Sequence, residues 1–247
     1  MARVSKEKID LDNKVVHAFF EQRGQKYDPS APFTSVLYQD NNPELAHKRD
    51  IYEKSKILPT LNLSVGMNVL DIGCGIGRWA SAIAPLVSSY VGTDISEALL
   101  RIARERSEYL PNTSFHTVGA GNLSQLAAND IQGFDLIIIA GVFIYLNDED
   151  IISCLRDIGN LAKPNCLIYL REPIAMTDRL TLKDFWSEDL DQNYSAIYRT
   201  ISELDKLFGA SLYKNGFDAV QFHKLYEDGL NNRTETVQHY AMIERQQ

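Results

Sequence analysis

The stretch Val69-Leu70-Asp71-Ile72-Gly73-Cys74-Gly75-Ile76-Gly77-Arg78-Trp79-Ala80 places three alternating glycines between an apolar run and a helix-forming segment. Glycine lets the backbone turn tightly and approach a ligand without an intervening Cβ. A helix that follows such a turn presents N–H groups that favour a carboxylate or a phosphate. The stretch therefore predicts a strand, a ligand-binding turn and a helix. The glycines alone leave a purely structural turn open as the alternative.

Two acids near these glycines favour the ligand-binding interpretation. Asp71 ends the first strand, where its carboxylate can meet an ammonium group or the N–H groups of the loop. Asp94 ends the next apolar run, and a carboxylate at this place can accept from both hydroxyls of a ribose. The alternative is that Asp94 caps a helix that begins near Glu97.

Short apolar runs and amphipathic segments alternate through the middle of the chain. The runs are 68–70, 90–92, 114–118, 136–140 and 167–170, and the amphipathic segments include 97–108 and 148–162. Strands that alternate with helices predict right-handed crossovers and a parallel sheet. Nearly continuous apolar runs are typical of strands buried on both faces. The expected fold is α/β: a Rossmann-like, doubly wound, seven-stranded and mostly parallel sheet with a terminal antiparallel hairpin and a helical lid.

Composition narrows the class of protein further. The 247 residues carry a formal net charge of −8, which disfavours a nucleic-acid partner because such binders need a basic face. The chain contains no run of about 18 apolar residues, so no membrane-spanning helix is expected. The cysteines, at positions 74, 154 and 166, form no C-x-x-C pair, so zinc and dithiol redox chemistry have no support and no metal is expected. An odd cysteine count and a polar N-terminus favour the cytoplasm.

The glycine loop and its two acids closely resemble motif I and the second-strand acid of class I S-adenosylmethionine-dependent methyltransferases. The motif in that family is an acid, one residue and then G-x-G-x-G, whereas dinucleotide-binding proteins prefer G-x-G-x-x-G and this chain has Arg78 at the last position. The resemblance implies S-adenosylmethionine as the cofactor and S-adenosylhomocysteine as the product. It also implies that Asp71 and the glycine loop hold the methionine end, and that Asp94 holds the ribose.

The segment Val118-Gly119-Ala120-Gly121-Asn122-Leu123 matches the part of the family that follows the third strand. Members often have Asp where Gly119 stands, and that acceptor for the adenine amino group is absent here. The backbone N–H of Ala120 is the expected substitute, with Asn122 as the second candidate. The cofactor contacts implied by the resemblance are Asp71, Gly73, Gly75, Gly77, Asp94, Ile95, Ala120, Gly121, Asn122 and Ala140.

Within one domain, 1–247, the sequence divides into four zones. Residues 1–60 are expected to form a helical cap, with a helix that begins at Pro43 and ends near Leu58. Residues 61–173 form the cofactor-binding core, and residues 174–200 break the alternation and are expected to form an irregular insertion on the acceptor side. Residues 201–247 close the fold with a helix, a C-cap at Gly216, and a hairpin of strands 219–225 and 236–243.

The segment 134–146 resembles the fourth strand of the family and its exit loop. Small-molecule members often carry a histidine where Tyr145 stands, and a phenol is a poor base at neutral pH. The candidates for a catalytic role are Tyr145, Glu172 and His17, while His116 in mid-strand is expected to be a core residue. Either one of these candidates supplies the base or the acceptor needs little activation.

The expected acceptor site combines arginines and tyrosines near the ends of the fourth and fifth strands. Arginine offers a bidentate fork to a carboxylate or phosphate, so an anionic or strongly polar acceptor is expected. The alternative is that the arginines form ion pairs of the lid with Glu172, Glu188, Asp189 and Asp191. The expected acceptor-binding residues are Tyr145, Arg171, Arg179, Tyr194, Tyr198 and Arg199.

The predicted function is transfer of a methyl group from S-adenosylmethionine to an oxygen or nitrogen of a small metabolite. Three other functions stay open: a nicotinamide-dependent oxidoreductase, a non-catalytic S-adenosylmethionine-binding protein, and a macromolecular methyltransferase. The loop spacing disfavours the first. The segment Ala140-Gly141-Val142-Phe143 lacks the N/D-P-P-Y/F signature of enzymes that methylate exocyclic base nitrogens, which disfavours the last.

Overall fold

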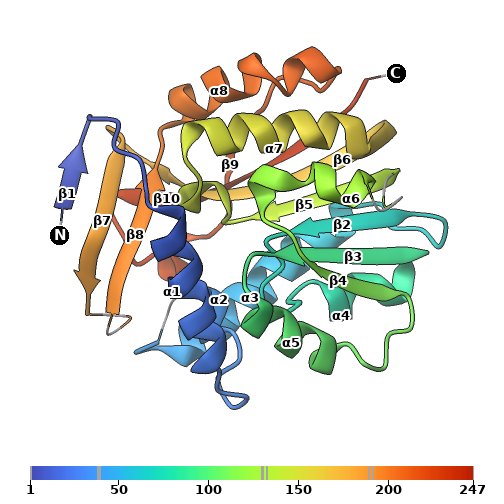
Figure 1. Cartoon of the computed structure of the whole chain (residues 1–247), viewed down its shortest axis with the longest axis horizontal. Helices are drawn as coiled ribbons and strands as arrows, with labels where there is room; N and C mark the ends of the chain where they lie inside the picture. The colour runs from blue at the N-terminus through green and yellow to red at the C-terminus, as the bar shows by residue number, and fades with distance from the viewer. Residues whose placement is uncertain are drawn as a thin grey trace.

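A central sheet of seven strands, in the order β4-β3-β2-β5-β6-β10-β9, carries the molecule (Figure 1). The computed structural model describes residues 2–37, 40–128, 131, 133–188, 190 and 192–246. The strands of this sheet are β2 (Asn68–Ile72), β3 (Ser89–Asp94), β4 (Thr113–Thr117), β5 (Phe134–Ala140), β6 (Ala162–Ala175), β9 (His223–Lys224) and β10 (Thr236–Glu244).

Strands β4, β3, β2, β5 and β6 pair in parallel, and β10 pairs antiparallel with both β6 and β9. The mostly parallel sheet and its terminal antiparallel hairpin are therefore confirmed. The hairpin is shorter on one side than expected, because only His223 and Lys224 of the expected strand 219–225 pair with β10. By contrast, β6 continues well beyond the apolar run 167–170 that marks it in the sequence.

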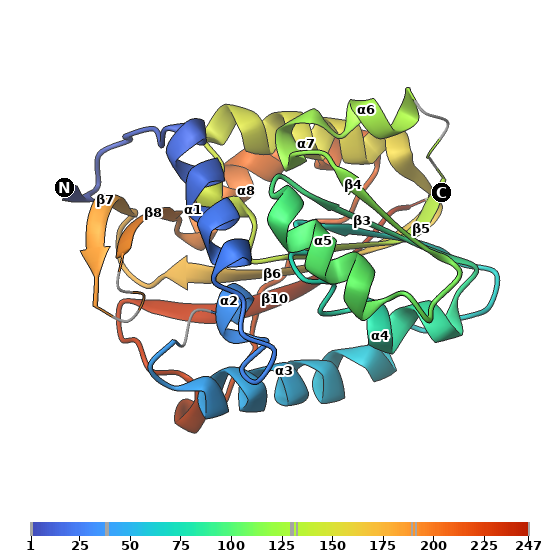
Figure 2. The ribbon, with the colours of Figure 1, turned by 60° about the horizontal axis from the view of Figure 1, so that its bottom comes forward.

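Helices cover both faces of the central sheet (Figure 2). On one face lie α3 (Pro43–Ile57), α4 (Ala80–Ile83) and α5 (Glu97–Arg106), and on the other α6 (Ser124–Ala127), α7 (Asp148–Leu161) and α8 (Ile201–Ala210). Alternate residues of β5 separate into the two core clusters: Ile138 packs with α3, α4 and α5, whereas Ile137 and Ile139 pack with α7 and α8. None of the helices described is long and apolar enough to cross a bilayer.

The ends of these helices follow the sequence signals. The side chain of Asn42 accepts from the N–H of Leu45 at the start of α3, with Pro43 in the first turn as expected. Ser96, not Asp94, caps α5 by accepting from the N–H of Leu99 at 3.2 Å. Gly216 adopts a left-handed conformation, with φ +81°, after the 3-10 turn that follows α8. Asp94 is thus left available for another role.

The expectation of an irregular insertion at residues 174–200 is wrong. This zone forms β7 (Leu180–Ser187) and β8 (Gln192–Tyr198), which pair antiparallel, and β1 (Ala2–Ser5) adds to the outer edge of β7. The resulting small sheet lies beside the central sheet, at the left of Figure 1. The N-terminal zone is accordingly not wholly helical, because its first residues belong to this small sheet.

Helices α1 (Asn13–Gln25) and α2 (Thr34–Leu37) form the rest of the cap together with α3. Helix α1 lies between the small sheet and α5 in both ribbon views. A Cβ on Gly24 of α1 would stand 2.6 Å from the Cβ of Ala98, so the cap packs closely against the start of α5. The remaining 3-10 turns are η1 (Leu58–Thr60), η2 (Ala84–Leu86), η3 (Ala120–Asn122), η4 (Phe143–Tyr145), η5 (Tyr213–Asn215) and η6 (Asp228–Leu230).

Candidate functional site

The glycine loop after β2 has the backbone conformation that its sequence requires. Gly73, Gly75 and Gly77 all have positive φ, at +67°, +54° and +69°. A Cβ on Gly73 would stand 2.5 Å from Val142 after β5, and one on Gly75 would stand 2.7 Å from Val36 of α2. The first two glycines therefore let neighbouring elements approach the loop from two sides. A Cβ on Gly77 would instead face Ala103 and Phe115 in the core, so this glycine serves helix and sheet packing.

The helix expected after the loop is short. Helix α4 comprises Ala80–Ile83 and ends before Pro85, which has no N–H to continue it. Its contribution as an anion-binding terminus is correspondingly small, and the ligand-binding capacity of the loop rests on its backbone and on the adjacent acids.

Asp94 at the end of β3 is buried against the glycine loop. One carboxylate oxygen accepts from the N–H of Gly75 at 2.9 Å and the other from the N–H of Ser96 at 2.9 Å. Burial raises the pKa of Asp94 to about 6, although these backbone hydrogen bonds oppose the shift. Each carboxylate oxygen can accept more than one hydrogen bond, so the group can hold the loop and still accept from a ligand.

Asp71 at the end of β2 is also buried, and its carboxylate accepts from the hydroxyl of Tyr90. Burial raises the pKa of Asp71 to about 7, and the hydrogen bond from Tyr90 acts in the opposite direction. A buried carboxylate that lines a pocket gains most from a cationic ligand, which would pair with its charge.

A pocket that we call the loop pocket lies over these residues and encloses about 810 Å³ of space between atoms. Phe20 and Val36 of the cap, Arg78 and Trp79 after the loop, and the carboxyl ends of β2, β3 and β5 form its walls. It is lined by Val16, Phe20, Val36, Asp71, Gly73, Cys74, Gly75, Arg78, Trp79, Asp94, Ile95, Leu99, Val118, Ala120, Ala140, Gly141, Val142, Tyr145, Leu146 and Arg171. The expected cofactor contacts Gly77, Gly121 and Asn122 are not among these residues, and Asn122 is exposed to solvent.

A second and larger space, the large cavity, encloses about 1,530 Å³ and shares Val36, Ala140, Gly141 and Arg171 with the loop pocket. Helix α3, the small sheet, β6 and the segment 226–238 surround it. Its lining residues are Val36, Leu37, Arg49, Ala140, Gly141, Ile144, Arg171, Pro173, Leu182, Phe185, Trp186, Ser187, Glu188, Leu190, Tyr194, Tyr198, Tyr226, Asn231, Asn232, Arg233, Thr236 and Gln238. The two spaces meet at the carboxyl end of β5.

Three tyrosine hydroxyls connect the two spaces. The hydroxyl of Tyr145 lies 3.1 Å from that of Tyr194, which lies 3.0 Å from that of Tyr198. Tyr145 lines the loop pocket, and the other two line the large cavity. The structure thus brings these three tyrosines together. That they surround one acceptor site with Arg171 stays a prediction.

A charged network that no sequence motif predicts joins the two spaces. Glu53 of α3 is fully buried and pairs with Arg78 at 2.9 Å and with Arg171 at 3.4 Å, and it accepts from the hydroxyl of Tyr169 at 2.7 Å. Although burial alone would raise it, the two guanidinium groups lower the pKa of Glu53 to about 2. Asp50 completes the network by pairing with Arg78 at 2.9 Å. Glu53 thus joins an arginine of the loop pocket to the arginine that both spaces share.

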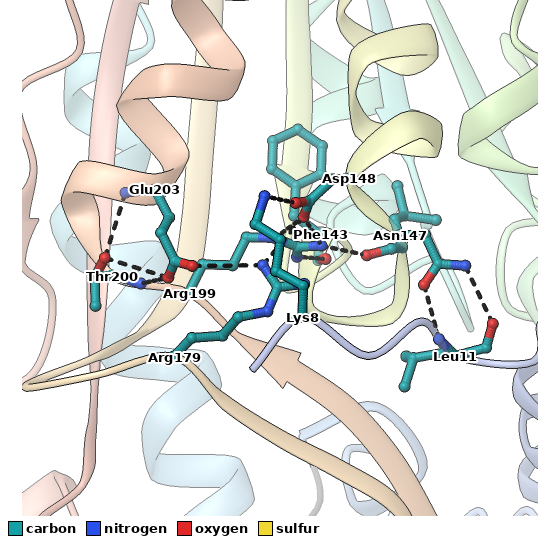
Figure 3. A network of polar contacts seen from close by, with 10 residues as sticks. Lys8, Leu11, Phe143, Asn147, Asp148, Arg179, Arg199, Thr200 and Glu203 are labelled. Atoms are coloured by element: carbon teal, nitrogen blue, oxygen red, sulfur yellow. Dashed lines mark hydrogen bonds and ion pairs between the residues drawn. The ribbon is translucent and has the colours of Figure 1, made fainter. Parts of the chain in front are cut away.

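Arg179 and Arg199, which the sequence predicts to bind the acceptor, line neither the loop pocket nor the large cavity. Both guanidinium groups are buried on Asp148 at the start of α7, with distances of 3.2 and 2.8 Å (Figure 3). Arg199 also donates to the carbonyls of Phe143 and Leu146. Both arginines therefore form ion pairs, as the alternative predicted, but their partner is Asp148 of α7 and not an acid of the lid. Asp189 and Asp191, two of the partners considered, lie outside the described residues.

Two of the three candidate bases, Glu172 and His17, lie outside both spaces. Glu172 is buried away from both spaces and accepts from the N–H groups of Val142 and Phe143 at 2.8 and 2.9 Å, so it fixes the exit loop of β5. Burial raises the pKa of Glu172 to about 7. His17 is exposed on α1 and lines neither space. Of the three candidates, only Tyr145 stands in the loop pocket.

His116 also departs from its expected place. It is half-buried on the edge strand β4, where its Nε2 lies 3.2 Å from the hydroxyl of Ser114. Burial lowers the pKa of His116, and the residue lies outside both spaces. It is therefore neither a core histidine nor a member of the site.

Comparison with known proteins agrees with this geometry. Residues 70–168 match the family model described as a methyltransferase domain. Phosphoethanolamine N-methyltransferase 1 of Caenorhabditis elegans is 25% identical over 158 residues, which are 64% of this chain and 32% of that protein. Demethylmenaquinone methyltransferase of Staphylococcus epidermidis is 26% identical over 200 residues, 79% of this chain and 72% of that enzyme. The chain thus spans about a third of the nematode relative and most of the bacterial one.

Solved structures share the fold. Phosphoethanolamine N-methyltransferase 1 of Haemonchus contortus, in complex with phosphoethanolamine and S-adenosylhomocysteine, superposes with a TM-score of 0.69 at 20% identity, covering 94% of this chain and 49% of that one. Magnesium protoporphyrin IX methyltransferase of Synechocystis, with bound S-adenosylmethionine, gives 0.61 at 18% identity, covering 97% and 100%.

The fold, the glycine loop with its two acids and the family match define a methyltransferase domain. It is of the class I, S-adenosylmethionine-dependent type, as the resemblance of the glycine loop implied. The relatives named above are methyltransferases of small molecules.

Proposed function

We propose that this chain transfers the methyl group of S-adenosylmethionine to an oxygen or nitrogen of a small metabolite. The observation that carries the proposal is the junction of the loop pocket and the large cavity at Ala140, Gly141 and Arg171. A cofactor held in the first space would present its reactive end to an acceptor held in the second. The names of the small-molecule relatives support the same class of acceptor.

The residues of the loop pocket fit the cofactor. Gly73 and Gly75 line the pocket without a side chain, Asp71 offers a buried carboxylate to the ammonium of the methionine part, and Asp94 offers acceptors to the ribose hydroxyls. Ile95 and Ala120 supply apolar surface for the adenine. When bound, S-adenosylmethionine supplies an electrophilic methyl group: the acceptor lone pair forms the new C–O or C–N bond while the C–S bond breaks and sulfur keeps its electron pair.

The chain contributes mainly position and exclusion of water. Phe20 and Val36 cover the loop pocket from the cap, and alignment of donor and acceptor is worth several kcal/mol in such displacements. Tyr145 stands in the loop pocket beside Tyr194, where its hydroxyl can hold the acceptor by a hydrogen bond. The three free, buried cysteines suit a reaction in the cytoplasm.

Asp94→Ala is expected to weaken S-adenosylhomocysteine binding by about 1.5–3 kcal/mol, the worth of hydrogen bonds to a charged group. This corresponds to about a ten- to hundredfold higher Kd in isothermal titration calorimetry. Asp94→Asn keeps an oxygen that can accept from the N–H of Gly75. The Kd of this variant is expected to lie between those of the unmodified chain and of Asp94→Ala. Wild-type affinity in the alanine variant would contradict the ribose role.

Cofactor affinity is expected to rise with pH from about 5.5 to 7.5 and to level off above. Burial raises the pKa of Asp71 to about 7 and of Asp94 to about 6, so both are partly protonated at pH 6, while a ligand ammonium pairs only with the ionised form. Binding at pH 6 should therefore release protons, which calorimetry in buffers of different ionisation enthalpy measures. A flat profile between pH 5.5 and 8 would exclude this coupling, and Asp71→Asn should flatten it.

A methyl-transfer assay with S-adenosylmethionine over a metabolite library tests the proposal as a whole. Turnover of at least one metabolite, with S-adenosylhomocysteine as the second product, is the expected result. Binding of NAD in place of S-adenosylhomocysteine would favour the oxidoreductase alternative. Cofactor binding without any turnover would favour the non-catalytic one, and turnover of RNA, DNA or protein alone would favour the macromolecular one.

A further inference from the structure

Two chemically different groups of residues line the large cavity. The first, which we call the cationic wall, consists of three arginines: Arg49 on α3, Arg171 on β6 and Arg233 before β10. The small sheet and its hairpin contribute apolar residues, which are Leu182, Phe185, Trp186 and Leu190. The acid that lines the cavity, within the described part of the chain, is Glu188, which is exposed. The lining thus combines cationic and apolar side chains.

Arg49 is the most informative member of the cationic wall. Its residue is only 7% exposed, and its guanidinium donates to the carbonyl of Leu230 at 2.9 and 2.7 Å and to Oδ1 of Asn232 at 2.7 Å. The ring of Tyr226 lies 5.6 Å from it. These partners are neutral, so within the described residues no carboxylate pairs with this buried cation. Most buried charges are paired, and one that lines a cavity with neutral partners only is suited to an anion from outside.

The neighbouring cations strengthen this point. Burial lowers the pKa of Arg49. The charges of Arg171 and Arg233 lower it further, although Tyr226 acts in the opposite direction, so both arginines lie close enough to repel Arg49. Arg171 is partly neutralised by Glu53, at 3.4 Å, but its other side faces the junction with the loop pocket. An oxyanion among the three arginines would relieve the repulsion and accept several charge-assisted hydrogen bonds.

We propose that the large cavity binds an acceptor with an oxyanion group, a phosphate or a carboxylate, and an apolar body. This inference rests on the proposed function and deepens it. The oxyanion lies against Arg49, Arg171 and Arg233, and the apolar body packs on Phe185 and Trp186 of β7. The third contact is the row of hydroxyls of Tyr194 and Tyr198, which leads toward the junction where the methyl group would be transferred.

The two tryptophans of the chain allow the cavity to be tested without knowledge of the natural acceptor. Trp79 lines the loop pocket and Trp186 the large cavity, so Trp79→Phe leaves a single fluorescent reporter in the large cavity. The probes are phenyl phosphate, benzoate, inorganic phosphate and benzyl alcohol, titrated in the presence of saturating S-adenosylhomocysteine. Phenyl phosphate or benzoate is expected to bind at least tenfold more tightly than both inorganic phosphate, which lacks the apolar body, and benzyl alcohol, which lacks the charge. The stronger of the two identifies the kind of oxyanion.

Arginine variants locate the binding. Arg49→Gln and, separately, Arg233→Gln are expected to weaken the better anionic probe at least tenfold and to leave benzyl alcohol unaffected. Arg233 is exposed, so its variant should fold even where loss of Arg49 disturbs the segment 230–232. Arg156→Gln, an exposed arginine on α7, is the matched control and is expected to bind the probe as before.

The outcomes separate this inference from the proposed function. Failure of the unmodified chain to bind S-adenosylhomocysteine would overturn the proposed function itself. Binding of S-adenosylhomocysteine together with equal affinities for the charged and neutral probes would overturn only the inference on the acceptor. If both arginine variants bound the anionic probe with unchanged affinity, the inference on the acceptor would also be overturned.

Discussion

Gly75→Val is expected to abolish binding of S-adenosylhomocysteine, raising its Kd at least a hundredfold. The residue has φ +54°, a left-handed conformation that is a genuine outlier for a β-branched residue. Its Cβ would stand 2.7 Å from Val36, and its N–H is the donor that ties the loop to Asp94. The variant must therefore change the loop where it meets the cap and Asp94, beside the place where we propose that the cofactor binds.

Isothermal titration calorimetry measures this effect, with circular dichroism and thermal unfolding to show that the variant is folded. Gly66→Val is the matched control, because a Cβ at Gly66 meets nothing within 4 Å. It is expected to bind S-adenosylhomocysteine as the unmodified chain does. Undiminished binding by a folded Gly75→Val protein would show that the loop is only a structural turn.

Glu53→Gln is expected to lower the free energy of unfolding by about 3–5 kcal/mol, the usual cost of removing one partner from a buried ion pair. The change leaves Arg78 and Arg171 buried and facing each other without the carboxylate that both contact. Urea denaturation at pH 7 measures the change in the free energy of unfolding. Glu44→Gln on the same helix is the control, since Glu44 is exposed and its ion pair among the described residues is with Lys48, one turn away. The denaturation midpoint of this variant should stay in place.

The acid dependence of stability provides an independent check. The folded-state pKa of Glu53 is about 2 and its ordinary value 4.5, so its contribution is complete above pH 4.5 and disappears as the pH falls through about 2. In Glu53→Gln this part of the acid sensitivity should be missing. A variant within 1 kcal/mol of the parent at pH 7 would mean that the network is replaceable.

The cofactor side could be predicted because its signals are local. The positions of Gly73 and Gly75 require left-handed backbone, and the acids that end β2 and β3 follow from the parallel sheet itself. Adjacent parallel strands end at the same edge, so Asp71 and Asp94 must lie near each other once the strands are recognised. Gly121 and Asn122 do not line the loop pocket, because a shared segment does not say which residues of a turn face a ligand.

The small sheet could not be recognised from alternation. Strand β7 has Asp184 with φ +49°, and its pairing with β8 shifts register between Leu182 and Phe185. Such an irregularity moves the side chains that follow it to the opposite face, so the two-residue period expected of a strand is interrupted. Strand β1 is short and polar, and it forms only because β7 offers it an edge.

The charged residues were hardest to place, because an ion pair is made in space and not along the chain. Arg179 and Arg199 pair with Asp148, which in the sequence is simply one of several acids in the first turn of α7. Helix α3 has so many charges that Glu53 and Arg49 look like a solvated face. They become buried only because the segment 225–238 and β6 close over that helix.

The attachment of the small sheet has a practical meaning for protein engineering. Arg179 precedes β7 and Arg199 follows β8, so Asp148 clamps the hairpin at its base while the side chains toward its tip line the large cavity. A combinatorial library confined to Leu182, Phe185, Trp186 and Leu190 would vary the shape of that cavity without touching the clamp or the glycine loop. The hairpin can thus be treated as an exchangeable cassette, in which new acceptor preferences are selected while the cofactor half of the enzyme is inherited unchanged.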